Sequence, residues 1–457
     1  MRTTLLRSVL MLLLVSSAIQ VGPAADETRK SALPDRLRWA PTAIPDRVCL
    51  CMTATPATSM AVTWRTDVTV TDAVAQIAVA DHGPGFANTA VTVSARSSTF
   101  ESNLNESLRH EVTFSSLLPA TKYAYRVGDG ANWSEWNHFT TAAESPAPFQ
   151  VLYVGDAQND IEQFWSRVVR EAFAESPRAA FFIHAGDLVN TGGHDGHWGE
   201  WFSAGGFVQR MIPGMPVPGN HEYIKETEAD DSPRILTPQW RATFAMPENG
   251  LPDLPETNYW FDYQGVRLIA LNSNTKTAEQ AAWLRRILAD NPQRWTVATF
   301  HHPLFSTRKG RDNKALREAW LPVFDEYGVD LVLQGHDHTY ARTGLVSADD
   351  TKPDADVAAI GSRVQTKPGA VFVVSVSGPK MYPLEPVPLN NRTAEDTQLF
   401  QVIEFSEQAI HYRALTATGT LYDEFELTKT PDGERTLTNL IPDIQERRRP
   451  PESAQVK

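Results

Sequence analysis

The sequence predicts an α/β protein in which a layered domain of alternating strands and helices follows an all-β sandwich. From residue 37 to residue 142 the apolar pattern is short and alternating, without convincing helical periodicity. After Phe149, long apolar runs alternate with segments that carry apolar residues at helical spacing. The stretch "AAESPAP" between the two patterns has the composition of a linker. We therefore expect the layered domain to span residues 148–427.

The composition is that of an ordinary globular protein of two or three domains, with 457 residues, 42% hydrophobic and 21% charged. The net charge of -13 argues against binding to nucleic acid or to anionic membranes. An anionic substrate would therefore need local positive charge at its binding site. The two cysteines, Cys49 and Cys51, are only two residues apart, so a disulfide between them is not expected.

The first 25 residues have the layout of a secretory signal peptide. Arg2 and Arg7 precede an apolar run that begins near Val9, and small residues follow at Ala24 and Ala25. The run is shorter than the roughly 20 residues that span a bilayer, and no later segment is apolar enough to cross one. We expect a soluble protein that is secreted or periplasmic, although an uncleaved membrane anchor is the alternative.

The sandwich is predicted from segments such as "MAVTWRTD" (residues 60–67) and "TKYAYRVGDG" (residues 121–130). In both, apolar and polar residues alternate and a turn follows. A run of residues spaced two apart occurs at Leu117, Pro119, Thr121, Tyr123, Tyr125 and Val127. This run resembles the L-x-P-x-T-x-Y-x-Y-x-V pattern of fibronectin type III domains. Residues 37–142 are therefore expected to form a fibronectin type III-like sandwich.

The layered domain is predicted from apolar strands that alternate with three amphipathic helices, expected at residues 161–175, 277–290 and 313–327. Further strands are expected up to about Leu427. The remaining segment, residues 428–457, ends in a charged stretch with two prolines and is expected to be a disordered tail.

Polar residues follow the predicted strands at five places. These are Gly155-Asp156, Gly186-Asp187, Gly219-Asn220-His221-Glu222, His301-His302-Pro303 and Gly335-His336-Asp337-His338. In open α/β sheets, ligands bind outside the carboxyl ends of the strands. Any one of these endings could be an ordinary turn, but five in series predict a metal site. Because residues two apart in an extended segment face the same side, His336 and His338 can point to one place.

The residue types indicate a site for two metal ions. Carboxylate, amide and imidazole ligands together suit Fe, Zn or Mn better than Ca. A carboxylate can bridge two cations about 4 Å apart, and such pairs hydrolyse phosphoesters by holding the attacking and leaving oxygens. The expected cofactors are therefore two divalent or mixed-valence metal ions.

The ordered set GD, GD, GNHE, HHP and GHDH resembles the calcineurin-like metallophosphoesterase superfamily, and the preceding sandwich makes the chain similar to purple acid phosphatases. The resemblance implies two central mixed sheets flanked by helices. It also implies a metal-dependent phosphoric ester hydrolase, with phosphorylated small molecules or proteins as substrates. Phosphomonoesters are the favoured substrates, attacked by metal-bound hydroxide without a covalent enzyme intermediate.

The resemblance also implies a role for each matching residue. Asp156 and His338 would bind the first metal, and Asp187 would bridge both. The second metal would be held by Asn220, His301 and His336. His221 would contact phosphate and protonate the leaving oxygen, and Glu222 would support the ligands from outside the centre.

Two positions depart from the family pattern. Asn190 stands where purple acid phosphatases have the tyrosine that gives their colour, so no purple colour is expected. Gln158 stands where the wider family often has a histidine ligand. We expect Gln158 to supply an amide oxygen to the first metal, with Asn190 as the less favoured candidate. His302 is expected to pack beside the ligands without binding a metal.

Two alternatives remain open. A phosphodiesterase or nucleotidase could use the same metal pair. A non-catalytic surface module could keep the metals for structure, but such a site would be closed and would have no use for His221. The physiological substrate, the metal and the oligomeric state are not encoded in these patterns.

Overall fold

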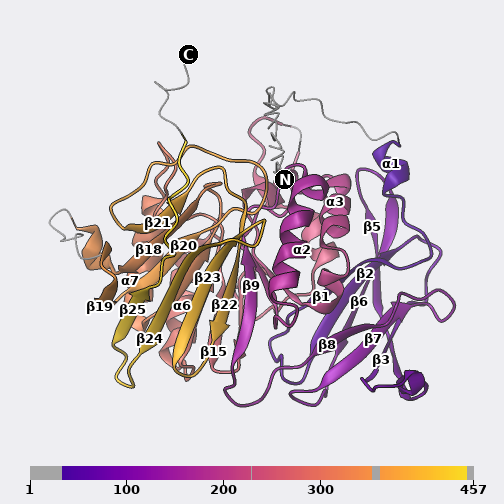
Figure 1. Cartoon of the computed structure of the whole chain (residues 1–457). Helices are drawn as coiled ribbons and strands as arrows, with labels where there is room; N and C mark the ends of the chain where they lie inside the picture. The colour runs from indigo at the N-terminus through magenta and orange to yellow at the C-terminus, as the bar shows by residue number, and fades with distance from the viewer. Residues whose placement is uncertain (1–32, 228, 353–360, 450–457) are drawn as a thin grey trace, which may run out of the picture.

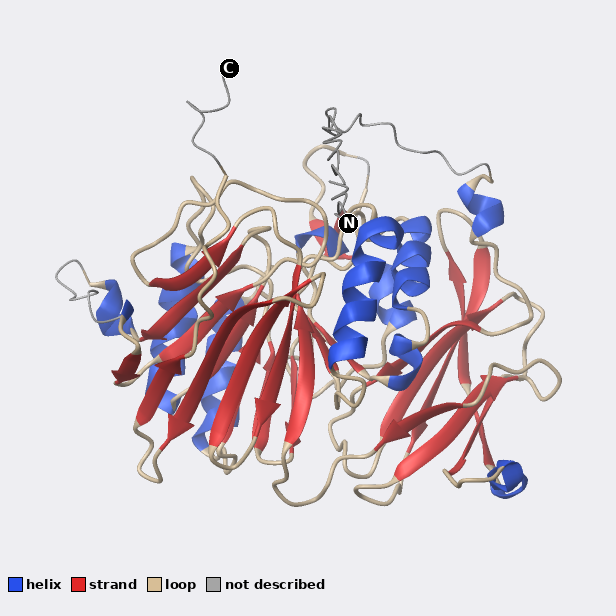
Figure 2. Cartoon of the chain, viewed as in Figure 1, coloured by secondary structure: helices blue, strands red, loops and turns tan. Residues whose placement is uncertain are grey.

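The computed structural model describes residues 33–227, 229–352 and 361–449. The predicted signal peptide, residues 1–25, lies outside the described residues. Figures 1 and 2 show strands grouped in packed sheets, with helices on their outer faces. Among the described residues, no helix combines the length and the apolar character that spanning a bilayer requires.

The N-terminal part is a β-sandwich, as the sequence predicts. Its two halves are four strands in the order β1-β2-β6-β5 and a separate sheet in the order β4-β3-β7-β8. Its elements are α1 (Asp35–Arg38), β1 (Asp46–Cys51), β2 (Met60–Thr66), β3 (Val74–Val79), η1 (Pro84–Thr89), β4 (Val91–Ser94), β5 (Arg96–Glu101), β6 (Glu106–Phe114), β7 (Lys122–Gly128) and β8 (Asn137–Thr140). Cys49 and Cys51 are buried and unbonded, as expected.

The alternating sequence of strand β2 predicts one buried apolar face and one exposed polar face. In the structure every residue of β2 is buried. Its polar side chains contact the α/β domain: Thr63 Oγ1 donates to the carbonyl of Thr243 at 2.6 Å. Arg65 pairs with Asp195 of the α/β domain at 3.4 Å. The sandwich therefore buries its polar face against the second domain.

Asp195 is the centre of a buried ionic cluster between the two domains. Its carboxylate accepts two hydrogen bonds from Arg47, at 2.6 and 2.9 Å. Arg65 and Arg109 each approach the same carboxylate at 3.4 Å. All four side chains are at most 5% exposed. Burial alone would raise the pKa of Asp195, but the arginines, led by Arg47, lower it to about 2.

The two domains share one sheet of twelve strands, in the order β19-β25-β24-β23-β22-β9-β10-β11-β1-β2-β6-β5. The joint is a short parallel pairing of β1 with β11, at Cys51 opposite Gly214. The strands from the α/β domain are β9 (Phe149–Val154), β10 (Phe182–His184), β11 (Gly214–Pro216), β19 (Val364–Thr366), β22 (Leu399–Phe405), β23 (Ala409–Thr416), β24 (Leu421–Lys429) and β25 (Arg435–Asn439).

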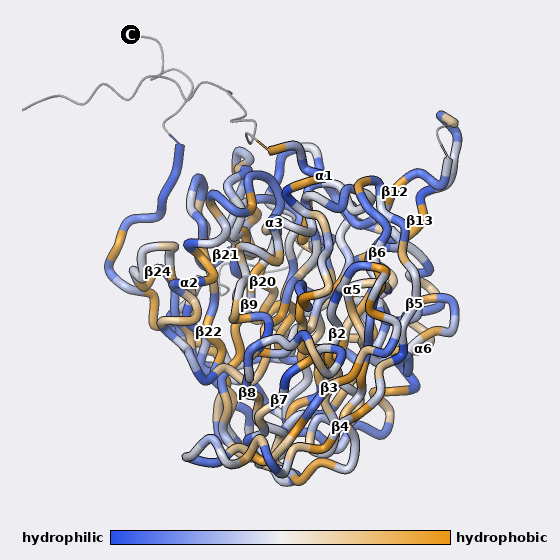
Figure 3. Tube along the Cα trace, turned by 90° about the vertical axis from the view of Figure 1, so that its right-hand side faces the viewer, coloured by the Kyte–Doolittle hydropathy of each residue, from blue (hydrophilic) through white to orange (hydrophobic). Residues whose placement is uncertain are grey.

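A second sheet of seven strands packs against the α/β part of the first, in the order β14-β15-β16-β17-β20-β18-β21. The two share one apolar core. Figure 3 colours the chain by hydropathy and shows hydrophobic stretches in orange among hydrophilic ones in blue. Gln334 N also donates to the Tyr153 hydroxyl across the two sheets at 2.9 Å. The strands are β14 (Tyr259–Tyr263), β15 (Val266–Ala270), β16 (Trp295–Thr299), β17 (Leu331–Gln334), β18 (Tyr340–Val346), β20 (Ala370–Val374) and β21 (Asn390–Ala394).

The helices cover the outer faces of these sheets, as predicted. On the first sheet lie η2 (Ile161–Trp165), α2 (Ser166–Glu175) and α3 (Asp195–Gly205). On the second lie α6 (Thr277–Ala289) and α7 (Lys314–Tyr327), whose apolar faces form a second core with its strands. Shorter elements are α4 (Val208–Met211), η3 (Asn220–Glu222), the hairpin of β12 (Tyr223–Lys225) and β13 (Arg234–Leu236), α5 (Pro238–Thr243) and η4 (Ala348–Thr351).

The expectation of a disordered tail from residue 428 is wrong for the residues that the structure describes. Strand β24 continues to Lys429, and β25 returns beside it as a hairpin. Arg435 explains part of this order, because its side chain pairs with the buried Asp330 at 2.7 Å. Further along, Glu395 N donates to the carbonyl of Arg447 at 2.9 Å. Residues 450–457 lie outside the described residues.

Candidate metal centre

The predicted ligands meet where strands of the two sheets end. Strands β9, β10 and β11 are parallel, and so are β16 and β17, so within each group the carboxyl ends share an edge. The first group is followed by Asp156, Asp187 and Asn220, and the second by His301, His336 and His338.

The backbone at four of these residues is in the left-handed region. The φ angles are 43° at Asp156, 51° at Asp187, 75° at His336 and 51° at His338. Such conformations cost on the order of 1–3 kcal/mol each and persist where the surrounding structure fixes them, often at functional sites. The strand ends therefore turn at the predicted ligands themselves.

The glycines next to the candidate ligands are needed mainly because neighbouring side chains lie too close to leave room for a Cβ atom. A Cβ atom on Gly219 would lie 2.1 Å from Asp187 Oδ1. At Gly186, whose φ is +84°, a Cβ atom would lie 2.7 Å from His301 Nδ1. Larger residues at either position would push the predicted ligands apart.

The first group of candidate ligands consists of Asp156, Asp187 and His338, all buried, with one ligand atom from each within 4.8 Å of the others. His338 Nε2 lies 3.7 Å from Asp156 Oδ1. The Gln158 amide lies between them, with its Nε2 2.9 Å from His338 Nε2 and 3.0 Å from Asp187 Oδ2. These are the four residues predicted for the first metal.

The second group surrounds His301. Its Nε2 lies 3.2 Å from Asp187 Oδ2, 3.2 Å from Asn220 Oδ1 and 3.0 Å from His336 Nδ1. Atoms bound to one cation at bond lengths of about 2.0–2.2 Å lie roughly 3–3.5 Å apart. The observed spacing is therefore that of a ligand set, and Asp187 belongs to both groups.

Backbone carbonyls orient two of the histidines. His301 Nδ1 donates to the carbonyl of Ala185 at 2.9 Å, and His338 Nδ1 donates to the carbonyl of Lys380 at 2.8 Å. In each of these two histidines, Nε2 is therefore the ring nitrogen that faces the centre. Metal-binding histidines are typically held in this way.

The electrostatics of the centre favour a cation. Burial would raise the pKa of Asp187, but the neighbouring His301 holds it well below its usual range. Burial would lower the pKa of His301, but Asp187 and then Asp156 raise it to about 9. The pKa of His338 is lowered by burial to about 3, so this imidazole is neutral and free to bind. The ionised Asp187 thus faces a positively charged His301, whose place as its cationic partner a metal ion could take, and a neutral His338.

The residues fit two metal ions. Asp156 Oδ1 and Gln158 Oε1 are buried without a hydrogen-bond partner among the described residues. A buried carboxylate oxygen without a partner is costly unless a cation satisfies it. Asp156 Oδ1, the shared Asp187 and the oriented imidazoles form two adjacent sets of ligands. Gln158 Oε1 joins the first set only when its amide is rotated by 180°, because Nε2 is the atom that faces Asp187 and His338. The mixed oxygen and nitrogen donors suit Fe, Zn or Mn.

His221 and Glu222 lie beside the ligands. His221 Nδ1 donates to the carbonyl of Asn190 at 2.5 Å, which leaves its Nε2 3.9 Å from Asp187 Oδ2. The His221 side chain is 25% exposed, so it faces the centre from the solvent side. The Glu222 carboxylate accepts from the amides of Asp187 at 2.9 Å and Gly219 at 2.7 Å. It therefore joins the two loops that carry Asp187 and Asn220.

His302, which the sequence predicts to pack beside the ligands, lies directly against His336 and close to His301. Its ring centroid is 4.3 Å from that of His336, and a ligand atom of each lies within 4.8 Å of one on His301. Its Nδ1 is engaged with Ser273 Oγ at 2.9 Å. Asn190, in contrast, approaches the centre through its carbonyl, which orients His221.

Replacing Gln158 by alanine tests whether its amide binds the first metal. The amide points at Asp187 and His338, and rotating it by 180° places Oε1 where Nε2 lies. Loss of this ligand should lower the affinity for one of the two ions about tenfold or more. Metal titration would measure this, with the exposed Gln163→Ala as the control. Wild-type metal content and turnover in Gln158→Ala would contradict the assignment.

Sequence reasoning missed a group of positive side chains beside the centre. Arg308 lies 3.6 Å from the ring centroid of Tyr382, whose ring centroid is 4.8 Å from that of His338. Lys380 Nζ lies 5.5 Å from the same Tyr382 ring centroid. Within the described ranges, neither Arg308 nor Lys380 forms an ion pair with a carboxylate. Together they supply the local positive charge that an anionic substrate of this acidic protein needs.

Two signals could have revealed this group. The segment "TRKGRDNK" concentrates four cationic residues directly after the His301 strand end. Lys380 follows β20, which runs parallel to β17 and so ends at the same edge. The rule that located the candidate metal ligands therefore applies to this strand as well.

Comparisons with known proteins agree with the fold and the strand-end motifs. Residues 45–141 match the model of the purple acid phosphatase N-terminal domain, and residues 149–340 match the calcineurin-like phosphoesterase model. The chain is similar to a solved purple acid phosphatase from yellow lupin seeds, PPD1, with a TM-score of 0.72 and 17% identity over 85% of this chain and 75% of that one. It is also similar to the structure of PhoD, with a TM-score of 0.63 and 12% identity over 90% and 96% of the two chains.

Among relatives, an uncharacterized protein of Mycobacterium tuberculosis is 28% identical over 63% of this chain and 60% of its own length. Purple acid phosphatase 15 of Arabidopsis thaliana is 27% identical over 53% of this chain and 51% of its own length. The chain thus spans little more than half the length of the curated relatives it matches.

The fold and the strand-end motifs agree with the phosphoesterase match, so residues 149–340 form a calcineurin-like phosphoesterase domain. Because the N-terminal domain of purple acid phosphatases precedes that domain, the chain is a purple acid phosphatase-like member of the superfamily. The family resemblance predicted from the sequence is confirmed.

Proposed function

We propose that this protein is an exported enzyme that hydrolyses phosphomonoesters with the help of two metal ions. The observation that carries the proposal is the convergence of two ligand groups that share Asp187. Asp156, Gln158, Asp187 and His338 would hold one ion, and Asp187, Asn220, His301 and His336 the other. Export rests on the composition of residues 1–25, which the structure does not describe.

When bound, the two ions would supply Lewis acidity, stabilising negative charge on the phosphoryl oxygens and lowering the pKa of water. The chain's own residues would position the reaction. Because His221 Nδ1 donates to the Asn190 carbonyl, Nε2 is the atom turned towards the centre, and in the doubly protonated ring it would carry a proton there. From the solvent side of the ligands, this proton could pass to the leaving oxygen.

The charge around the centre favours monoesters over diesters. A phosphomonoester carries nearly two negative charges at neutral pH, whereas a diester carries one. Arg308 and Lys380 stand beside His338 without a carboxylate partner in the described part of the chain. Such uncompensated positive charge attracts the more highly charged ester more strongly. A diesterase or nucleotidase using the same residues remains the second candidate, and the rates on an aryl monoester and an aryl diester distinguish the two.

Hydrolysis of an aryl phosphate by protein that has been stripped of metal and reloaded with Mn, Zn or Fe tests the proposal. Activity should return with at least one metal in the wild type. It should stay absent in His336→Ala, which removes a ligand of the second ion. His82→Ala is the matched control, because His82 is fully exposed in the sandwich domain. Two bound metals without turnover of monoesters or diesters would instead indicate the non-catalytic module.

A further inference from the structure

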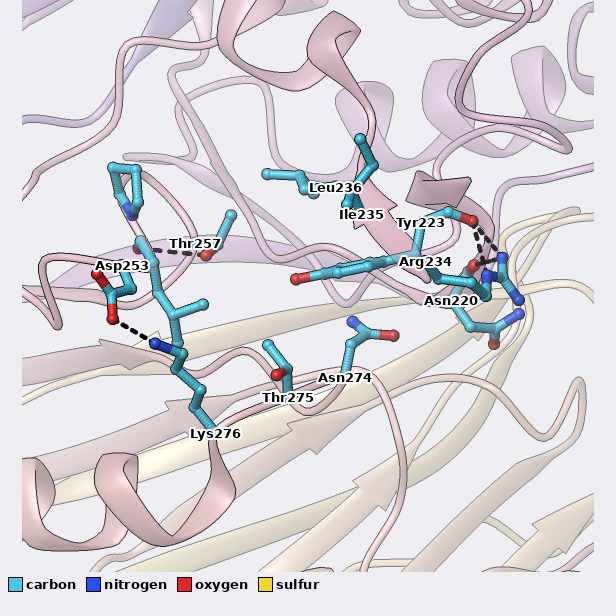
Figure 4. Close-up of a pocket in the computed structure, with 12 residues that line it drawn as sticks. Asn220, Tyr223, Arg234, Ile235, Leu236, Asp253, Thr257, Asn274, Thr275 and Lys276 are labelled. Carbon is cyan, nitrogen blue, oxygen red and sulfur yellow. Dashed lines mark hydrogen bonds and ion pairs between the residues drawn. The ribbon is translucent and has the colours of Figure 1, made fainter. Parts of the chain in front are cut away.

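A cavity of about 370 Å³ opens beside Asn220, the predicted ligand that faces His301. Figure 4 shows Tyr223 extending across this cavity, with Asn220 and Arg234 at one end and Lys276 at the other. The volume lies in the range of about 300–1,000 Å³ that is usual for small-molecule sites. The cavity therefore borders the metal centre directly and has room for a compact organic group.

One side of the cavity is aromatic and apolar. Tyr223 follows the GNHE loop at once, and its hydroxyl accepts a hydrogen bond from Asn272 Nδ2 at 2.7 Å. This bond and the hairpin of β12 and β13 hold the Tyr223 ring in place. Leu236 and Leu254 line the same space. A flat ring would find a fixed aromatic partner there.

The other side offers neutral hydrogen-bonding groups. Asn274 Nδ2 donates to the carbonyl of Pro218 at 3.0 Å and to Asn272 Oδ1 at 3.2 Å. Its Oδ1 and the hydroxyl of Thr275 have no hydrogen-bond partner among the residues that the structure describes. Both residues line the cavity, so both can bind polar substituents of an occupant.

The charged groups of the cavity are already engaged. Arg234 donates to the backbone carbonyls of Asn220, at 2.6 Å, and of Tyr223. Lys276 forms an ion pair with Asp253. A second phosphate group would have to displace these contacts, whereas a neutral group would not. The occupant is therefore a neutral group, in contrast to the positive surroundings of His338.

We propose that this cavity binds the organic part of the substrate, a neutral alcohol that carries a ring, such as an aryl or nucleoside group. The inference rests on the proposed phosphomonoesterase function and adds to it the class of ester. The phosphate would lie at the metal ligands, and the ring would lie against Tyr223 beyond Asn220. Tyr223 and Thr275 would then determine the preference for ring-bearing over small acyclic esters.

Filling the cavity tests the proposal. In Thr275→Trp, kcat/KM for phenyl phosphate and for adenosine 5′-monophosphate should fall about tenfold or more relative to that for glycerol 2-phosphate, mainly through KM. Tyr223→Ala should also lower the ratio of kcat/KM for these two ring-bearing esters to kcat/KM for glycerol 2-phosphate. The ratio should keep its wild-type value in Glu279→Trp, which places the same side chain at an exposed position of α6. A larger fall in kcat/KM for phenyl phosphate would identify the group as aryl, and a larger fall for adenosine 5′-monophosphate would identify it as a nucleoside.

Calorimetry of the metal-loaded protein with phenylphosphonate and methylphosphonate separates this proposal from the proposed function. If the wild type turns over no ester but binds phenylphosphonate more tightly than methylphosphonate, and Thr275→Trp loses that preference while Glu279→Trp keeps it, the cavity assignment stands and the phosphatase function does not. Equal losses for ring-bearing and acyclic ligands in folded Thr275→Trp would overturn the assignment. The assignment would also be overturned if Thr275→Trp kept the wild-type ratio of kcat/KM for ring-bearing esters to kcat/KM for glycerol 2-phosphate.

Discussion

Replacing Asp187 by asparagine is expected to lower kcat for an aryl phosphate by about a thousandfold. In the described part of the chain, Asp187 is the carboxylate shared by both ligand groups, with His301 Nε2 and Gln158 Nε2 both within 3.2 Å of its Oδ2. Stabilisation by a metal ion is worth several kcal/mol in the transition state, and each 1.36 kcal/mol is tenfold in rate. An amide has the same shape but lacks the charge that holds two cations together.

Steady-state kinetics and measurement of metal content by mass spectrometry would check this expectation. Asp290→Asn is the matched control, because Asp290 is exposed at the end of α6. Metal content should fall below two ions per chain in Asp187→Asn and stay at the wild-type value in the control. A variant that kept two ions and wild-type turnover would show that Asp187 is not the bridging ligand.

Replacing Asp195 by alanine should have the largest effect on stability, about 3–5 kcal/mol in the free energy of unfolding. The change leaves Arg47, Arg65 and Arg109 buried without their shared carboxylate, and removing one partner of a buried ion pair has costs of this size. Urea unfolding at neutral pH would measure it. Asp46→Ala is the control: Asp46 pairs with Arg65 but its side chain is 41% exposed, so about 0–1 kcal/mol is expected.

The ionic cluster around Asp195 also predicts how the difference in the free energy of unfolding between the wild type and Asp195→Ala depends on pH. The pKa of Asp195 is about 2 in the folded protein and near its ordinary value of 3.8 in the unfolded chain. A lowered carboxyl pKa stabilises the fold above the unfolded value, and the contribution is lost as the pH falls through the folded value. The stability gap between wild type and Asp195→Ala should therefore be constant above pH 4 and shrink between pH 4 and pH 2. A gap that grew on acidification would contradict this assignment.

The local patterns of the sequence predicted the elements and the order of the candidate ligands. Apolar periodicity identified the helices at residues 161–175, 277–290 and 313–327, because each buries one face on a sheet. Strand ends identified the candidate ligands, because parallel strands bring their carboxyl ends to one edge. The assignment of these residues, Gln158 included, to metal ions stays a prediction.

Contacts between distant segments could not be predicted in this way. The arginines around Asp195 come from β1, β2 and β6. Arg65 and Arg109 stand in regularly paired stretches, whereas Arg47 has a left-handed φ of 49° at an irregularity of β1, and no local sequence pattern links the three. Their shared partner becomes visible only when the two domains are packed. The same holds for Arg308 and Tyr382, which a bridge between Arg308 and Leu384 brings together. The error in the tail had a similar cause, because Asp330 orders Arg435 from a distance of 105 positions.

The pairing of β1 with β11 has a practical consequence for shortening the chain. A fragment cut near residue 145 would keep every candidate metal ligand but would lose the strand that lies beside β11. The bare edge of β11, and the hydrophobic surface around it, would then be open to strand addition by other molecules. Such a fragment should aggregate during expression. We therefore expect the two halves to unfold together. A sandwich exchanged between relatives should support the second domain only if it keeps the arginines that pair with Asp195, namely Arg47, Arg65 and Arg109.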